Sequence, residues 1–136
     1  MQMRASVYVP DYEGQKVADI EISYTAVGAR VFLVDDDSKL EVGSIIPSPI
    51  STRVYNAQNV LVGEVHGSVV AATLTAYYSE GGRPREDQFY VVNGYVRDYR
   101  GGDPGGQIAG VDGIYDYRLV GGFIAILLDL GRFRPS

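Results

Sequence analysis

Residues 54–65 read Val54-Tyr55-Asn56-Ala57-Gln58-Asn59-Val60-Leu61-Val62-Gly63-Glu64-Val65. This stretch joins a β-branched residue and an aromatic to a turn-forming middle, and then to an aliphatic residue, Gly, any residue and another aliphatic. The same order returns where Val7-Tyr8 leads to 17–20, where Val31-Phe32 leads to 42–45, and where Ile114-Tyr115 leads to 121–124. Each copy is too short to bury its own apolar face, so the repeat predicts several units that share one interior.

The aromatic residues that open successive units lie 18 to 24 residues apart. They are Tyr8, Phe32, Tyr55, Tyr77, Tyr95 and Tyr115. The middles of the units, at 11–14, 35–38, 57–59, 81–84 and 101–106, contain Gly, Asp, Asn and Pro, which favour turns. Residues rich in Val, Ile and Tyr flank them, as in β-hairpins. The sequence therefore predicts a single all-β domain over 1–136, built of about six hairpin-like units. We expect tandem antiparallel hairpins closed into a small barrel or a pseudo-symmetric β-flower.

The aromatic residue and the Gly of each unit are expected to lie close together. If the loop around Asn59 has an odd number of residues, Tyr55 lies directly opposite Gly63, and its ring can cover the bare backbone there. An even loop places the two residues diagonally, still within reach.

The apolar segment 122–128 has no polar face. We interpret it as a central strand covered on both sides, while a short buried helix stays open, because periodicity does not separate the two at this length.

The first and third copies, 7–20 and 54–65, resemble the Y-D-x-x-G-x-x-V-G/A-x-I units of small bacterial all-β domains known as the four-fold β-flower. The third copy is also similar to the opening of a PRC-barrel, a small β-barrel interaction domain. The β-flower resemblance implies hairpins related by pseudo-rotational symmetry. The six units found here leave the symmetry number open, and neither family implies a catalytic residue.

Composition excludes several classes of site. The chain has no Cys, which removes disulfides, thiolate zinc sites and cysteine nucleophiles. A net charge of −5 argues against a nucleic-acid partner. The first residues lack the apolar run of a signal peptide, and no apolar stretch approaches the length that spans a bilayer. We therefore expect a soluble, cytoplasmic protein without a membrane partner.

No motif indicates a metal, a cofactor or a catalytic centre. His66 is the only histidine and is expected in an exposed turn. The acidic run 35–37 lacks the Gly and Glu positions of an EF-hand calcium loop. The glycine pairs do not match the spacing of a phosphate-binding loop. The segment 101–106, which contains two of these pairs, is expected to be a flexible hairpin loop. These absences favour a non-catalytic role.

The best candidate for a binding surface is the segment 95–100. On a strand, Tyr95, Arg97 and Tyr99 share one face, and Tyr and Arg are enriched at binding hot spots. Tyr117, in the cluster 114–118, can lie beside them if the hairpins are neighbours. The competing interpretation is that the tyrosines cover the edge of the core and that Arg97 pairs with an acid.

The sequence therefore favours a non-catalytic structural or binding module. Its partner is an unidentified protein or small molecule, and self-association through the Tyr-rich strand faces into a homo-oligomer is one form of this prediction. One alternative is a small-ligand or carbohydrate-binding β-barrel in which Tyr95, Tyr99 and Tyr117 stack on the ligand. A weaker alternative is a carboxylate-based hydrolase, which requires Asp98 and Asp116 to converge in a pocket with at least one raised pKa.

Overall fold

The computed structural model describes residues 2–67 and 71–135, which form ten strands and one helix. The strands are β1 (Gln2–Val9), β2 (Gln15–Tyr24), β3 (Ala29–Asp35), β4 (Ser38–Ile46), β5 (Thr52–Asn56), β6 (Leu61–Gly67), β7 (Ala72–Glu80), β8 (Arg83–Val92), β9 (Tyr95–Arg100) and β10 (Asp103–Asp112). The helix α1 (Tyr117–Asp129) follows β10. Each strand pairs antiparallel with its neighbours in the chain, and β1 pairs with β10 to close a barrel. The predicted barrel of antiparallel hairpins is confirmed.

Local turn chemistry explains why the hairpins form where the sequence predicts them. Gly81 and Gly82 have φ values of +59° and +79° and join β7 to β8. Two successive positive φ values define the two-residue turn that matches the twist of paired strands. Gly101 and Gly102 repeat this geometry between β9 and β10. The segment 101–106 is thus a tight two-residue turn followed by strand, and the predicted longer loop was wrong.

The recurring sequence unit is a hairpin with a β-bulge. In the third copy Val54, not Tyr55, lies opposite Gly63, and Tyr55 lies opposite Leu61. One extra residue, Val62, lies between these two pairs, as in a bulge. Both Val62 and Gly63 are buried as a result. Our expectation that Tyr55 faces or diagonally covers Gly63 was wrong, because it assumed a regular register.

Three other hairpins carry the same bulge. Their inner pairs are Val7 with Ala18, Val31 with Gly43, and Val96 with Ala109, and the extra residues are Val17, Val42 and Ile108. The hairpin β7–β8 instead keeps an uninterrupted register from Ala72↔Val91 to Glu80↔Arg83. The repeated aliphatic-Gly/Ala pair is therefore the sequence signature of a bulge that directs two successive residues inward.

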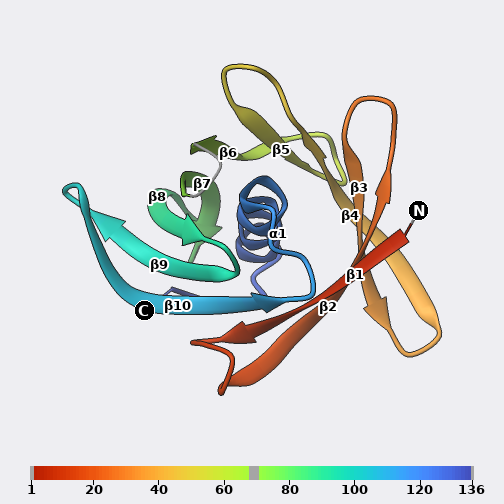
Figure 1. Ribbon diagram of the computed structural model, residues 1–136, viewed down its shortest axis with the longest axis horizontal. Helices are drawn as coiled ribbons and strands as arrows, with labels where there is room; N and C mark the ends of the chain where they lie inside the picture. Colours follow the sequence, from red (N-terminus) through yellow and green to blue (C-terminus); the bar gives the residue numbers. More distant parts are fainter. Residues whose placement is uncertain (1, 68–70, 136) are drawn as a thin grey trace.

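The sixth predicted unit is not a hairpin but the helix α1, and the strand expected over 122–128 was wrong. Asp116 begins the helix by accepting a hydrogen bond of 2.9 Å from the backbone N–H of Arg118. Figure 1 shows α1 inside the ring of strands, and every residue from Leu119 to Leu128 is buried. A helix enclosed on all sides has no polar face. This enclosure is why the segment resembles a covered strand in sequence.

Glycine residues fix the position of α1 against the barrel wall. A Cβ atom added to Gly63 of β6 would lie 2.7 Å from the Cβ of Ala125, and one added to Gly122 of the helix would collide with Ile45. In the same way, Gly43 of β4 leaves room for the side chain of Ile126, and Gly121 of the helix leaves room for the side chain of Val65. The Gly of the repeat thus makes room for the helix, which fills the interior at van der Waals contact.

Candidate binding face

The residues of the predicted binding segment lie on the outside of the barrel. Val96 is fully buried in β9, while Tyr95 and Arg97 on either side of it are exposed. Arg97 lies opposite Tyr90 of β8, and the ring of Tyr90 stacks on Tyr99 with centroids 5.8 Å apart and an interplanar angle of 23°. We name the set Tyr90, Tyr95, Arg97 and Tyr99 the tyrosine face.

The tyrosine face does not include Tyr117. This residue begins α1 and packs, half-buried, against the core, with the guanidinium of Arg118 5.7 Å from its ring centre. Its neighbour Tyr115 is the exposed tyrosine of that cluster. The Tyr115 hydroxyl donates a hydrogen bond of 2.6 Å to Asp112, at the end of β10.

Tyr12, which sequence reasoning missed, supports the tyrosine face from the β1–β2 loop. Its ring meets Tyr95 edge-on, with centroids 5.1 Å apart, and its hydroxyl donates a 2.6 Å hydrogen bond to the carbonyl of Val111. The ring also covers Gly110, where an added Cβ would lie 3.1 Å from both the ring and the backbone nitrogen of Tyr12. Covering of a bare strand glycine by an aromatic ring, predicted for Tyr55, therefore occurs at Tyr12. Gly110 inside a predicted strand was the available signal.

Burial perturbs the titration of Tyr12. Desolvation, followed by the nearby Tyr95, Tyr115 and Asp112, raises the pKa of its hydroxyl to about 12. The phenol therefore stays protonated and keeps donating to Val111 throughout the neutral range. Its role is to anchor the loop and hold Tyr95 in place.

Charge on the tyrosine face is unpaired. Within residues 2–67 and 71–135, no ion pair involves Arg97, whereas Arg100 at the end of the same strand bonds Asp98 at 2.8 Å. The competing interpretation, in which Arg97 pairs with an acid, finds no support in this part of the chain. Tyr95 is 47% exposed. The face thus offers a guanidinium without an ion pair among the described residues, beside the partly exposed rings of Tyr95 and Tyr99.

The outer surface of β1–β4 has the opposite character. Glu21 is only 3% exposed, because Arg4 at 3.1 Å and Lys39 at 2.7 Å cover its carboxylate. The ring of Phe32 carries two cations, Lys39 at 4.8 Å and Arg30 at 5.2 Å from its centre. Arg30 also bonds Glu41. We name Arg4, Glu21, Arg30, Phe32, Lys39 and Glu41 the ion-pair face. The hydrogen bond from Lys39 and, to a smaller extent, the hydrogen bond from Arg4 lower the pKa of Glu21 below its usual value.

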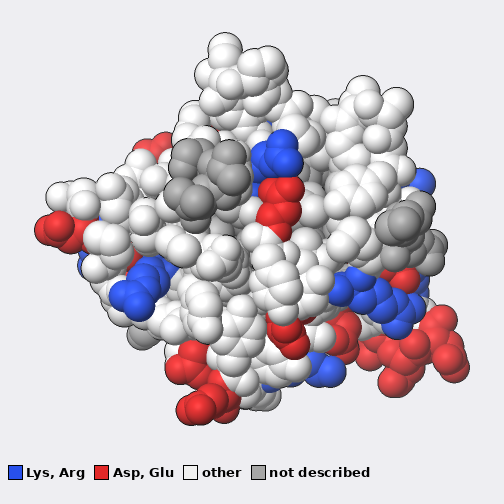
Figure 2. All heavy atoms as spheres, in the orientation of Figure 1, with Lys and Arg blue, Asp and Glu red and all other residues white. Residues whose placement is uncertain are grey.

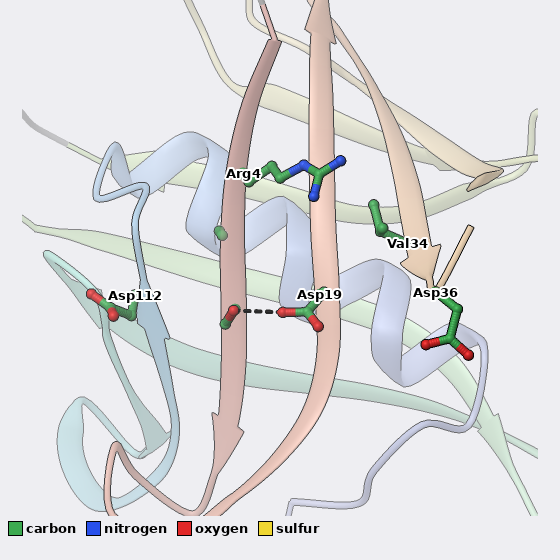
Figure 3. A pocket seen from close by; sticks show the side chains of 7 residues that line it. Arg4, Asp19, Val34, Asp36 and Asp112 are labelled. Atoms are coloured by element: carbon green, nitrogen blue, oxygen red, sulfur yellow. Dashed lines mark hydrogen bonds between the residues drawn. The ribbon is translucent and has the colours of Figure 1, made fainter. Parts of the chain in front are cut away.

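Carboxylates near the ion-pair face do not form a metal site. Asp19 of β2, Asp36 of the β3–β4 turn and Asp112 of β10 line one groove, and Figure 3 shows them spread apart rather than converging. Asp19 accepts a 2.6 Å hydrogen bond from Ser6 and pairs with Lys16 at 3.0 Å. Figure 2 shows acidic side chains gathered where Figure 1 places the β3–β4 turn, outside the barrel. Among the described residues, no group of three metal-ligating side chains is positioned to hold an ion.

The carboxylates of the hydrolase alternative have structural partners. Asp116 caps α1 and bonds Arg118 at 2.8 Å, which lowers its pKa, whereas a general acid needs a raised one. Asp98 pairs with Arg100. His66 is exposed at the end of β6, 3.8 Å from Glu64. These contacts give neither carboxylate the environment that the alternative requires.

Comparison with protein-family models, curated proteins and solved structures finds no match to this chain. Over the residues that the structure describes, α1 is the only helix, and it is too short to cross a bilayer. The candidate site therefore has to be argued from its own geometry.

Proposed function

We propose that this protein is a non-catalytic binding module that contacts its partner through the tyrosine face. The observation that carries the proposal is the unpaired guanidinium of Arg97, placed between aromatic rings on the outside of a barrel. Tyr gives a large contact area at low entropic cost, and both Tyr and Arg are enriched at interface hot spots. Membership of the four-fold β-flower family and a cytoplasmic location remain parts of this proposal.

The interior of the barrel supports the alternative of a small-ligand barrel less well. Helix α1 occupies the space in which such barrels hold their ligand, and Phe123, Ile124 and Leu127 are fully buried there. The rings of Tyr95 and Tyr99 face outward, and Tyr117 packs on the core. A partner that contacts Tyr95 and Tyr99 therefore binds the outside of the barrel and not its interior, which suits a macromolecule.

Site-directed photo-crosslinking tests the proposal. A benzoylphenylalanine is placed either at position 95, where it replaces an exposed aromatic ring and leaves Arg97 in place, or at position 30, where Arg30 belongs to the ion-pair face. In cells that produce the protein, we expect adducts from position 95 and not from position 30, and we expect the additional change Arg97→Ala to remove them. Equal adducts from both positions, or none from position 95, would contradict the proposal. Light scattering of the purified protein over a concentration series shows whether the partner is a second copy.

A further inference from the structure

Strand β8 lacks a neighbour along half of its length. Its pairing with β7 extends to Arg83 at the hairpin turn, but its pairing with β9 stops at Phe89↔Asp98. Residues 83–87 therefore have a strand partner on one side only. A groove lies on the open side, lined by Arg85, Glu86, Asp87, Gln88, Tyr99 and Arg100. Figure 1 shows the β9–β10 hairpin projecting beyond the other strands here.

The register fixes which backbone groups face the open side. Glu80 and Arg83 close the two-residue turn, so this pair exchanges both backbone hydrogen bonds. Alternation along the strand then turns the backbone N–H and C=O groups of 84, 86 and 88 away from β7. Pro84 has no N–H group, and proline is accepted at an open strand edge for that reason. Glu86 presents both a donor and an acceptor. Gln88 presents its N–H group, while its C=O faces the N–H of Tyr99 at the end of the β9 pairing.

Side chains along this edge differ in whether they already have partners. Arg85 is neutralised by Glu80 and Asp87, each at 3.1 Å, and Arg100 by Asp98. Glu86 is exposed, and among the described residues it forms no ion pair. On the far wall of the groove lies the ring of Tyr99, already stacked on Tyr90. The edge thus combines free backbone groups, one unpaired carboxylate and one aromatic wall.

We propose that this edge binds an extended peptide segment of a partner protein, which adds to β8 as an extra strand. Backbone hydrogen bonds to Glu86 and Gln88 hold the segment. Side chains of a strand alternate, so residues two positions apart lie beside Glu86 and beside Gln88 with Tyr99. The segment carries a basic residue at the first of these positions and an apolar residue at the second. The inference deepens the proposed function and rests on it, because Tyr99 belongs to both surfaces.

A second copy of this chain fits the edge poorly. In the two-fold antiparallel pairing that uses 84, 86 and 88 of both copies, Glu86 lies directly opposite its own counterpart. Like charges directly opposite each other on paired strands are destabilising. Proline and a charged side chain are also common devices that prevent sheet edges from pairing with themselves. The geometry therefore favours a basic partner over self-association at this edge.

The test uses a fluorescein-labelled octapeptide of sequence Ser-Thr-Val-Thr-Lys-Thr-Ser-Gly and the purified full chain. Fluorescence anisotropy measures its affinity, and amide hydrogen exchange locates it. We expect binding, with slower exchange at Glu86 and Gln88. A peptide with Glu in place of Lys is expected to bind at least tenfold more weakly, and one with Pro in place of Val not to bind.

Two matched variants separate backbone pairing from side-chain contact. Gln88→Pro removes the outward N–H group and is expected to weaken binding at least tenfold, whereas Gln88→Ala keeps that group and most of the affinity. Circular dichroism confirms that both variants fold. Glu86→Gln is expected to abolish the preference for the Lys peptide over the Glu peptide.

The outcomes distinguish this inference from the proposed function. Absence of binding by every peptide, or equal binding to Gln88→Pro and wild type, overturns the strand-addition inference even where position 95 still crosslinks. Peptide binding that requires the Gln88 N–H group and persists in Arg97→Ala supports the inference. In that case, absence of adducts from position 95 in the protein that keeps Arg97 would overturn only the proposal for the wider tyrosine face.

Discussion

The tyrosine face and the ion-pair face lie on the outside of the same barrel and handle polar groups in opposite ways. On the ion-pair face, each charge has a partner on another strand, and the carboxylate of Glu21 is covered on two sides. On the tyrosine face, the hydroxyl of Tyr12 is committed to Val111 but the guanidinium of Arg97 is not paired. The difference teaches that internal pairing marks a surface which serves the fold, while unpaired Arg beside Tyr marks one available to a partner.

The largest effect is expected where the tyrosine face is tied to the barrel. Gly110→Val places a side chain against the ring and backbone of Tyr12, and should lower the free energy of unfolding by about 1–3 kcal/mol through overpacking. Urea denaturation measures the loss. Gly106→Val is the matched control on the same strand, because an added Cβ there meets nothing within 4 Å. Equal losses in the two variants would show that Tyr12 does not constrain this face.

A smaller effect is expected from the hydroxyl of Tyr12 alone. Tyr12→Phe keeps the ring over Gly110 but leaves the Val111 carbonyl without its donor, at a cost of about 1 kcal/mol. Tyr8→Phe is the control: Tyr8 also lies opposite Gly110, and no hydrogen bond of its hydroxyl occurs among the described residues. A Tyr12→Phe loss no greater than that of Tyr8→Phe would contradict the anchoring role.

The contribution of the Tyr12 hydroxyl to stability should also depend on alkaline pH. The folded-state pKa of Tyr12, about 12, lies above its ordinary value of 10.0. The unfolded chain therefore loses this proton first, and the contribution of Tyr12 is complete below pH 10 and declines as the pH rises toward 12. Denaturation at pH 9 and pH 11 should show a smaller alkaline loss in Tyr12→Phe than in wild type. Identical losses would mean that the hydroxyl titrates normally.

The ion-pair face should respond to acid instead. The pKa of Glu21 is lowered, first by Lys39 and then by Arg4, so its contribution is present above the ordinary carboxyl pKa and is lost as the pH falls through the lowered value. Glu21→Gln should reduce the acid dependence of the unfolding free energy. The effect is smaller than that of Tyr12→Phe, because Arg4 is 70% exposed and water screens the pair. Glu13→Gln, at an exposed loop position, should leave the acid dependence unchanged.

The smallest effect on stability is expected at the centre of the tyrosine face. Arg97→Ala removes an exposed, unpaired side chain and should change the free energy of unfolding by less than about 0.5 kcal/mol. A loss above about 1 kcal/mol would show that Arg97 serves the fold after all, and the distinction between the two faces would disappear.

The hairpins could be predicted because their turns depend on local residue chemistry. The bulge and the helix could not, because they depend on packing between distant segments. Gly81-Gly82 and Gly101-Gly102 set turns by their own backbone freedom, so the sequence alone places them. The repeated Val-Gly pair marks the bulge at Val62, but only the strand register shows that this pair forms a bulge. The segment 122–128 was interpreted as a strand because the barrel buries the helix on all sides. Its sequence is therefore apolar all round and lacks the polar face by which helices are usually recognised.

The candidate site divides in the same way. Alternation within β9 places Tyr95, Arg97 and Tyr99 together, because three residues of one strand need no tertiary information. Tyr117 was expected beside them because residues 114–118 were predicted to belong to a neighbouring hairpin. In the structure this hairpin is absent from the described residues, and Tyr117 begins α1 instead. Tyr12 and the open edge at Glu86 arise from contacts between distant segments, which only the coordinates reveal.

The position of α1 after all ten strands has a consequence for biosynthesis. The strands leave the ribosome before the segment that they must surround, and β1 waits for β10, about a hundred residues later, to close the ring. The nascent chain therefore exposes its inward-facing Val and Ile side chains until α1 has been synthesised. Apolar strands exposed during that interval are prone to aggregate.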